Sequence, residues 1–422
     1  MEKFVGYVCS LCKTEYPPGD VTYTCPKDGG NLDVLLDYDA IKAKYQPEDI
    51  LSRHDPSLWR FLPLLPVSMP KGDSTPLHAA GGTPVYKLTS LAEKLGLQNL
   101  WLKDESKNPT ASFKDRASAI VVARAQELGS EIVVTASTGN AGAALAGMSA
   151  AVGQKAVIFA PKSAPQAKVA QLLIYGAKVI LVDGTYDDAF DLTIQCANEF
   201  GWYCRNTGYN PFTAEGKKTA AFEIWEWWQD AHLEMHQEVG EEIDHKPLTV
   251  FVSVGDGNII SGIHKGFKDL HRLGWIARIP RLIGVQAEGS SAVADAFHGN
   301  TEEIKPVSSK TIADSISVDL PRDGVRAVRA SKETDGTYIT VSDDEILTAI
   351  AELGRIGVFA EPAGAAAYAG LVKGTGSGVV RGADPILVLN TGSGLKDVHA
   401  AIQAVGSATV IEPTLEAVRG LL

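Results

Sequence analysis

The 422-residue sequence has few cysteines, no long apolar run and no excess of positive charge. No apolar stretch reaches the roughly 20 residues that a membrane-spanning helix needs. Basic residues number 39 against 51 acidic ones, and the net charge of -12 argues against nucleic acid or an anionic membrane as a partner. The N-terminal stretch MEKFVGYVCSLC lacks the apolar region and cleavage site of a secretory signal. We therefore expect a cytoplasmic protein.

Five cysteines are present, and two of them form the motif Cys9-x-x-Cys12. This usage is typical of a reducing compartment, with metal-bound or free thiols in place of disulfides. The segment CSLCKTEYPPGDVTYTCPKD has the spacing of a zinc ribbon, with Asp28 where a fourth cysteine would stand. Two interpretations stay open. In the first, a zinc ion is held by Cys9, Cys12, Cys25 and Asp28. In the second, the ribbon keeps its shape without metal.

The length predicts two or three domains, and an apolar fraction of 45% with a charged fraction of 21% is typical of a globular protein. We expect a small β-rich, zinc-ribbon-like module over residues 1–38 and a Pro-rich connector over 39–83 that packs on the following domain, 84–422. Strands are predicted at 131–136, 155–160, 178–183, 248–254, 281–287 and 385–390. Helices are predicted at 141–152, 165–176, 186–200, 215–231, 258–273 and 342–354, the last with a Ser342–Glu345 capping box. This alternation predicts an α/β fold with parallel-rich sheets.

Three glycine-rich loops follow predicted strands: ASTGNAG (136–142), SVGDGNIISG (253–262) and NTGSGLKD (390–397). Proteins of this class bind their ligands at the carboxyl ends of strands. Each loop alone is compatible with an ordinary turn. The three together indicate backbone cradles for anions or for the edge of a ring.

Lys114 lies between the turn NPTAS and a strongly helical stretch, with Ser112 as the candidate N-cap. The first turn of a helix disfavours an ammonium group because the helix dipole is positive there. A depressed pKa makes a lysine amine a nucleophile for carbonyl groups. The alternative is a surface ion pair of Lys114 with Asp115 or Glu105.

The segment NPTASFKDRAS resembles the lysine segment of fold type II pyridoxal-phosphate enzymes, and most closely that of the threonine synthase family. Further similar segments occur in the family's order: GGTPVYKL, STGNAGAALA, NPFTAEGKKTAAFEI, SVGDGNIISGIHKGF, GVQAEGS, EPAGAAAYAGL and NTGSGLKD. The resemblance implies a tryptophan synthase β-like fold with two α/β lobes, the smaller one spanning about 115–205 within the larger. The presence of the N-terminal module is in line with this resemblance, because some threonine synthases carry a similar N-terminal extension.

The resemblance implies that Lys114 is the catalytic residue, which carries pyridoxal 5′-phosphate as a Schiff base and moves protons at the substrate α-carbon. The implied cofactor contacts are Lys114, Phe113, Asn140, Gly255, Asp256, Gly257, Asn258, Ile259 and Thr391. Asn140 matches the amide that bonds the cofactor's 3′-oxygen. Residues 255–259 match the loop that binds its phosphate, and Thr391 matches the hydroxyl that faces its pyridine nitrogen. Phe113 packs beside the ring or belongs to the core. The implied substrate contacts are Ser137, Thr138, Gly139, Asn206 and Thr207.

The family's reaction converts O-phosphohomoserine and water into threonine and phosphate, so the resemblance implies a lyase that acts on an amino acid, in a homodimer as is usual for such enzymes. Two departures qualify this expectation. Thr213 stands at the position of an arginine that binds the substrate phosphate, and Asp256 replaces a neutral asparagine. Arg205, Lys217 or Lys218 are candidates for the missing charge. A β-elimination or β-replacement enzyme, such as a serine/threonine dehydratase-like ammonia-lyase, is the alternative, and a non-catalytic cofactor-binding protein is a third hypothesis.

Overall fold

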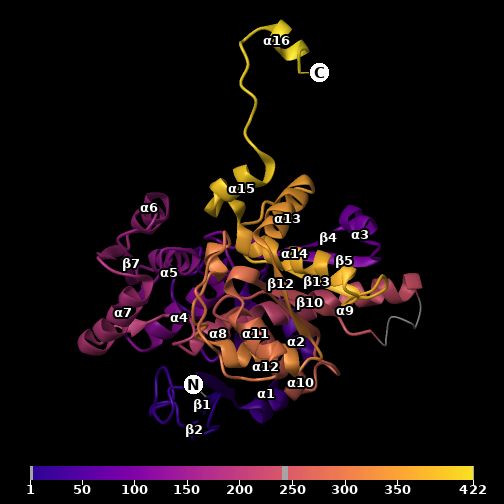
Figure 1. Cartoon of the computed structure of the whole chain (residues 1–422). Helices are drawn as coiled ribbons and strands as arrows, with labels where there is room; N and C mark the ends of the chain where they lie inside the picture. Colours follow the sequence, from indigo (N-terminus) through magenta and orange to yellow (C-terminus); the bar gives the residue numbers. More distant parts are fainter. Residues whose placement is uncertain (1–2, 240–245, 422) are drawn as a thin grey trace.

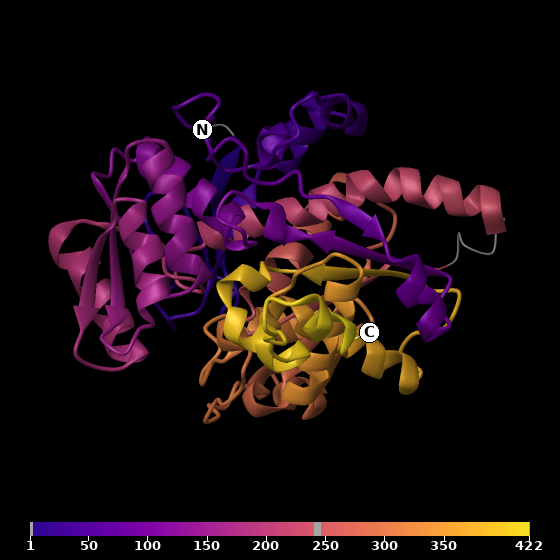
Figure 2. The same cartoon turned by 90° about the horizontal axis from the view of Figure 1, so that it is seen from above.

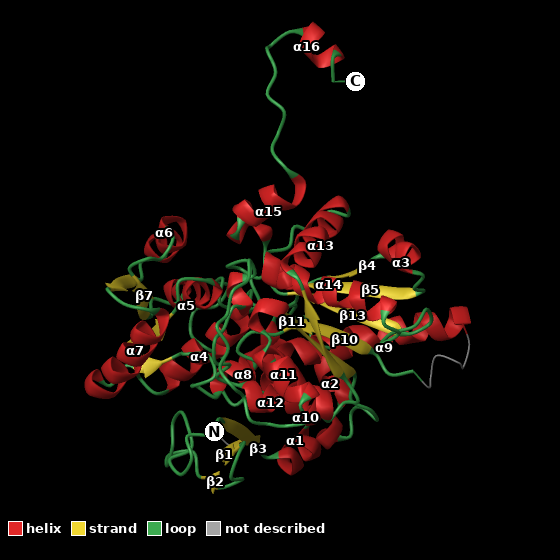
Figure 3. Ribbon diagram, in the orientation of Figure 1, coloured by secondary structure: helices red, strands yellow, loops and turns green. Residues whose placement is uncertain are grey.

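The computed structural model describes residues 3–239 and 246–421, and these contain three β-sheets (Figures 1 and 3). A three-stranded sheet belongs to the N-terminal part, and a six-stranded and a four-stranded sheet belong to the rest. Within the described ranges, no helix combines the length and the apolar character needed for crossing a bilayer.

The largest sheet has the strand order β12-β11-β10-β13-β5-β4. Its strands are β4 (Val85–Lys87), β5 (Asn99–Asp104), β10 (Thr249–Ser253), β11 (Arg281–Ala287), β12 (Thr337–Val341) and β13 (Pro385–Asn390). All neighbours pair in parallel except β4 and β5, which are antiparallel. Helix α14 (Pro362–Gly376) shares a hydrophobic core with Phe251, whereas α10 (Asn258–Leu273) shares another with Val250 and Val252. Helices therefore cover both faces, which explains why β10 and β13 are buried throughout.

The smaller lobe contains a fully parallel sheet in the order β8-β7-β6-β9. Its strands are β6 (Ile132–Ala136), β7 (Lys155–Pro161), β8 (Lys178–Val182) and β9 (Tyr203–Cys204). Figure 2 shows this sheet together with its helices as a separate unit at one side of the molecule. These helices are α5 (Asn140–Ala151), α6 (Gln166–Ile174) and α7 (Tyr186–Phe200). Helices α4 (Lys114–Glu127) and α8 (Phe212–Lys217) pack against each other beside it.

The N-terminal sheet is antiparallel, in the order β2-β1-β3. Its strands are β1 (Phe4–Cys9), β2 (Glu15–Tyr16) and β3 (Leu32–Leu36). Three short helices follow: α1 (Tyr38–Lys44), α2 (Pro47–Leu51) and η1 (Leu58–Leu64). Leu32, Val34 and Leu36 alternate along β3 and are buried in the main core. Trp59 and Phe61 of η1 are buried in the same core.

The remaining helices are spread along the rest of the described chain. They are η2 (Glu105–Lys107), α3 (Thr89–Leu95), α9 (Thr219–Val239), η4 (Glu288–Ser290), α11 (Ala292–His298), η5 (Asp314–Ile316), α12 (Gly324–Lys332), α13 (Asp343–Arg355), η6 (Gly394–Lys396), α15 (Val398–Val405) and α16 (Leu415–Arg419). The capping box predicted for Ser342 and Glu345 is confirmed at the start of α13. Beyond α15 the chain runs away from the body to α16, as Figure 1 shows.

The predicted α/β class with parallel-rich sheets is confirmed, and two local predictions are wrong. The helix expected over 215–231 is two helices: α8 ends at Lys217, and α9 begins at Thr219. Ser112 does not cap α4: the helix follows Phe113, and the buried Ser112 hydroxyl has no hydrogen-bond partner among the described residues.

Candidate active site

A cavity of about 620 Å³ lies where the three glycine-rich loops meet. Its lining includes residues 136–141 after β6, residues 253–259 after β10 and Thr391 after β13. Lys114, at the start of α4, also faces this space. The carboxyl ends of strands from both larger sheets thus converge on one lysine, which is the usual place for a ligand in an α/β protein.

The loop before Lys114 is held in an unusual backbone conformation. Ala111 has a φ of 64°, in the left-handed region that side chains other than glycine rarely adopt. The carbonyl of Ala111 accepts a hydrogen bond from Ser393 N at 3.1 Å, and Phe113 N donates to Thr391 O at 2.9 Å. These bonds fix the lysine loop to the loop after β13, so Lys114 is positioned by the tertiary structure and not by its helix alone.

The alternative of a surface ion pair for Lys114 is wrong. Asp115 accepts hydrogen bonds from the backbone N–H and the hydroxyl of Thr110, and Glu105 is bonded to Arg116 at 2.7 Å. Lys114 is partly exposed to the cavity although it lies deep in the protein. Burial lowers its pKa, and the positive charge of Arg205 acts in the same direction while Glu361 opposes it. A larger share of the amine is therefore unprotonated and nucleophilic than in water.

The loop between β10 and α10 has the geometry of an anion cradle. Gly257 has a φ of 88°, and a Cβ there would lie 2.7 Å from Asp323 O, so the backbone requires glycine. A Cβ at Gly255 would lie 2.8 Å from Ile316 Cα. The loop directs the N-terminus of the 16-residue helix α10 at the cavity, and the buried Ser253 hydroxyl beside it has no protein partner among the described residues. Free backbone N–H groups and an unused hydroxyl at one point fit a phosphate group.

Asn258, the first residue of α10, is held by side chains on both sides. Its Oδ1 accepts a hydrogen bond from Lys217 Nζ at 2.6 Å, and its Nδ2 donates to Asp323 at 2.7 Å. Asp323 in turn accepts two hydrogen bonds from Arg326, at 2.6 and 2.7 Å. The cradle is therefore supported by a continuous row of buried polar groups.

The amide of Asn140 donates to both carboxylate oxygens of Glu361, at 2.8 and 3.0 Å. Glu361 is thus a hydrogen-bond acceptor, and its side chain makes no capping bond to α14. Burial raises the pKa of Glu361. Asp314 instead lies at the outer rim of the cavity, where it pairs with Lys168 at 2.5 Å.

The loop after β6 presents small polar groups to the cavity. Ser137, Thr138 and Gly139 line it, and a Cβ at Gly139 would meet no atom within 4 Å, so the backbone there is open to a ligand. Asn206 supports this loop from behind, because its Oδ1 accepts hydrogen bonds from Thr135 Oγ1 at 3.0 Å and from the N–H of Ala136 at 2.8 Å.

Two further predicted residues differ in where they lie. Thr207 lines the cavity and accepts a hydrogen bond from Arg205 at 2.5 Å. Phe113 is fully buried and does not line the cavity, so of its two predicted roles the structure favours packing in the core.

Tyr186 and Ser315 line the cavity as well, although the sequence did not point to them. They escaped prediction because a tyrosine at a helix start and a serine in an irregular loop carry no local signal.

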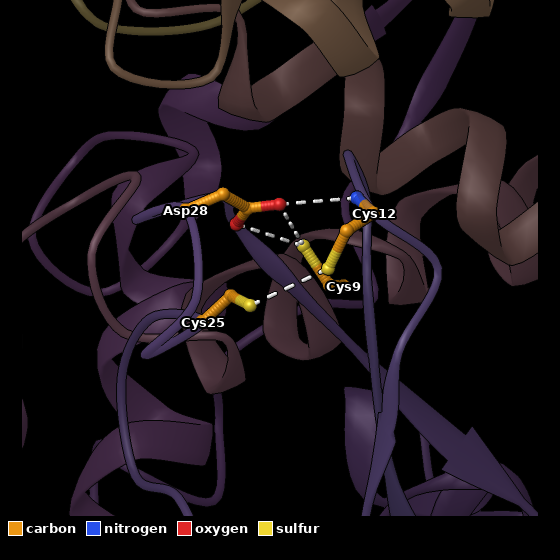
Figure 4. A group of neighbouring side chains, drawn as sticks. All are labelled: Cys9, Cys12, Cys25 and Asp28. Carbon is orange, nitrogen blue, oxygen red and sulfur yellow. Dashed lines mark hydrogen bonds between the residues drawn. The ribbon is translucent and has the colours of Figure 1, made fainter.

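Three thiols and one carboxylate gather at the knuckles of the N-terminal module (Figure 4). The ligand atoms of Cys9, Cys12, Cys25 and Asp28 all lie within 4.8 Å of one another. Cys9 Sγ lies 3.3 Å from an oxygen of Asp28, and Cys12 Sγ lies 3.7 Å from Cys25 Sγ. The N–H of Gly30 lowers the pKa of Asp28, which keeps its carboxylate charged. A set of three sulfur atoms and one oxygen at this spacing fits a tetrahedral metal ion.

Comparison with known proteins places the chain in a family. The family model described as pyridoxal-phosphate dependent enzyme matches residues 77–392, so the chain is a pyridoxal-phosphate dependent enzyme. The chain is 38% identical over 420 residues to threonine synthase of Methanocaldococcus jannaschii, covering 98% of each chain. It is 37% identical over 416 residues to threonine synthase of Methanosarcina acetivorans, covering 97% of each. The chain belongs to the threonine synthase family of these enzymes.

Solved structures confirm the fold type. The chain resembles threonine deaminase isoform 2 from Solanum lycopersicum at 24% identity with a TM-score of 0.64, covering 81% of this chain and 92% of that one. It resembles maize serine racemase at 25% identity with a TM-score of 0.60, covering 74% and 88%. These similarities concern the fold alone.

Proposed function

We propose that this protein converts O-phosphohomoserine and water into threonine and phosphate. The observation that carries the proposal is the amine of Lys114 in a cavity built by the three loops, within a chain that aligns along almost its full length with threonine synthases. The family implies pyridoxal 5′-phosphate as the cofactor.

The residues of the cavity fit this cofactor. Lys114 would hold it covalently, and the backbone of 255–259 with the unused Ser253 hydroxyl would hold its phosphate. Asn140 and Thr391 are proposed to contact its 3′-oxygen and its pyridine nitrogen. When bound, the cofactor stores the negative charge that develops on the substrate carbons.

Lys114 is proposed as the group that moves protons between the substrate carbons. An amine with a lowered pKa is suited to this task, because its ammonium form gives up a proton more readily than that of an exposed lysine. The hydroxyl groups and backbone N–H groups of Ser137, Thr138 and Gly139 would bind the substrate's α-carboxylate. Thr207 would add a polar contact at the same wall of the cavity, and Asn206 would act by holding the loop after β6.

The test is a product assay with the purified holoenzyme and O-phosphohomoserine. Threonine and phosphate formed in equal amounts would support the proposal. Formation of a 2-oxo acid and ammonia from serine or threonine, without threonine from the phosphorylated substrate, would refute it.

The second candidate is a β-elimination or β-replacement enzyme of the same fold, such as a serine/threonine dehydratase-like ammonia-lyase. Asp256 favours it, because this residue lines the cavity and its carboxylate would repel a phosphate dianion. Burial raises the pKa of Asp256, however, which reduces this repulsion by favouring the neutral acid. The same product assay decides between the two candidates.

We further propose that Cys9, Cys12, Cys25 and Asp28 bind a structural zinc ion. The distances among their ligand atoms and the charged state of Asp28 support this assignment. Residues 1–38 would then form a metal-stabilised module, 39–83 a connector packed on the catalytic domain, and 84–422 that domain, with its smaller lobe over about 115–205. One equivalent of zinc in the purified protein would support the site, and its absence from metal-replete preparations would refute it.

A homodimer in the cytoplasm is the proposed working form. Val398, Ile402 and Val405 recur on one side of α15 and are more than half exposed, which gives the chain an apolar surface that a second copy would cover. None of the five cysteines forms a disulfide, in agreement with a reducing compartment. Sedimentation equilibrium measures the assembly directly, and a monomer at micromolar concentration would refute the dimer.

A further inference from the structure

Two consecutive lysines at the end of α8 are both buried but have very different surroundings. Lys218 Nζ lies 2.5 Å from Glu215 and 2.8 Å from Asp269, so its charge is balanced. Lys217 is only 1% exposed, and its Nζ has a single hydrogen-bond partner among the described residues, the neutral amide oxygen of Asn258 at 2.6 Å. Burying an ammonium group without an opposite charge is costly. Lys217 therefore requires an explanation that Lys218 does not.

The carboxylates nearest to this row do not supply the missing charge. Asp323 is already paired with Arg326, and it reaches Lys217 only through the amide of Asn258. Asp256 attracts Lys217 electrostatically, but no ion pair within 4.0 Å links them among the described residues. Burial, Arg205 and Lys114 lower the pKa of Lys217 well below its usual value.

A second buried cation stands behind the same wall of the cavity. Arg205 is fully buried, donates to Thr207 at 2.5 Å and to Ser118 at 3.3 Å, and its Nη2 has no partner among the described residues. Its bonds are to hydroxyl groups, which leave its charge unbalanced. Burial lowers the pKa of Arg205 to about 10. Lys217 and Arg205 are thus two buried cations on one side of the cavity, and neither forms an ion pair with a carboxylate among the described residues, an arrangement that suits an anion.

Lys217 also lies where its side chain can contact an anion in the cavity. It lines the cavity beside the N-terminus of α10, and a Cβ at Gly262 would lie 2.7 Å from Lys217 Cβ, so α8 and α10 are in close contact there. Thr213, at the position of the family's arginine, precedes Lys217 by four residues, and its hydroxyl contacts the same oxygen of Asn258 at 3.2 Å. Positions i and i+4 share one face of a helix. A cation at 217 therefore reaches the region that a cation at 213 would serve.

We propose that Lys217 is the specificity-determining cation of this cavity, which binds a phosphate monoester dianion together with the helix N-terminus, while Arg205 supports it through Thr207. This inference rests on the proposed function. The dianion has two sources with the same chemistry, the 5′-phosphate of the cofactor and the phosphate of the substrate. The alternative is that Lys217 is a neutral amine whose only role is to hold Asn258.

The experiment compares Lys217→Gln and Lys217→Arg in the full chain. The first arm measures the affinity of the apoenzyme for pyridoxal 5′-phosphate. The second measures, on holoenzyme, the KM for O-phosphohomoserine and the affinity for inorganic phosphate by calorimetry. We expect Lys217→Gln to weaken at least one of these affinities by about tenfold or more, and Lys217→Arg to restore most of it, because an arginine keeps the charge. Lys268→Gln, which removes an exposed lysine from α10, controls for net charge.

The outcomes distinguish the cofactor phosphate from the substrate phosphate, and anion binding by Lys217 from a purely structural role. A loss confined to the first arm assigns Lys217 to the cofactor phosphate, and a loss confined to the second assigns it to the substrate phosphate. Unchanged affinities in Lys217→Gln, or equal losses in Lys217→Gln and Lys217→Arg with a lowered Tm, overturn the proposal in favour of a structural amine. If the parent enzyme makes no threonine, the proposed function fails, but the cofactor and inorganic phosphate affinities still test Lys217.

Discussion

Arg326 in α12 forms an ion pair with Asp33 in β3, with Nη1 2.5 Å from the carboxylate oxygen. The same guanidinium holds Asp323, which accepts the hydrogen bond from Asn258 at the start of α10. The N-terminal sheet is therefore connected to the anion cradle by an unbroken row of polar contacts. Asn31 strengthens this connection, because its amide donates to the carbonyl groups of Gly208 and Arg322.

Asp33→Asn should weaken this connection. The variant keeps the size of the side chain but removes the charge opposite Arg326, so we expect a loss of about 1–2 kcal/mol in the free energy of unfolding of the holoenzyme. Urea denaturation measures it. Asp20→Asn is the control, since that carboxylate is exposed in the same module. Equal effects of the two variants would contradict a specific role for Asp33.

Lys114→Ala should abolish the yellow colour of the holoenzyme and its turnover while leaving the far-UV circular dichroism unchanged. The reason is the loss of the only side chain that we propose as covalent anchor and proton carrier. Borohydride reduction followed by peptide mapping should place the cofactor on residue 114 in the parent protein. Lys107→Ala, an exposed lysine in the same loop, should retain colour and activity. A cofactor tag on another lysine would disprove the assignment.

His264 should make the protein sensitive to acid. Burial, assisted by the charge of Lys268 and opposed by Asp33, lowers the pKa of His264 from 6.5 to about 3. The folded state thus prefers the neutral ring, which contributes stability above pH 6.5 that is lost as the pH falls towards 3. Between pH 6.5 and about pH 4 this loss should reach about 3 kcal/mol.

His264→Met removes this titration, so its free energy of unfolding should vary less with pH over that interval. Denaturant unfolding at a series of pH values is the measurement. His54→Met serves as the control, because His54 is exposed. Parallel pH profiles for the parent and His264→Met would show that other groups cause the acid sensitivity.

Asp28→Cys should strengthen metal binding in the N-terminal module. The substitution completes a set of four sulfur ligands, which suits zinc better than three sulfur atoms and one oxygen. The variant should keep its zinc at chelator concentrations that remove it from the parent, while Asp28→Ala should lose it more readily. Metal content after dialysis measures the difference. Identical retention in all three proteins would indicate that position 28 does not contact the metal.

Much of the fold and of the site was predictable because it depends on local patterns. The buried strands read as short apolar runs, and their predicted bounds agree closely with β6, β10, β11 and β13. The glycine-rich loops follow those strands in the chain, and parallel strands bring their carboxyl ends to one edge. The unfavourable position of Lys114 at a helix start was also visible in the sequence. Each of these features is set by residues that are close together in the sequence.

The tertiary structure alone decided which buried charges are balanced. Lys217 and Lys218 are adjacent and chemically identical in the sequence, yet one faces the cavity and the other faces Glu215 and Asp269, because consecutive helix residues point in different directions. The pairing of Asp33 with Arg326, 293 residues apart, left no local signal. Sequence determined the elements and the lysine at their centre, whereas packing between distant segments determined the electrostatics around it.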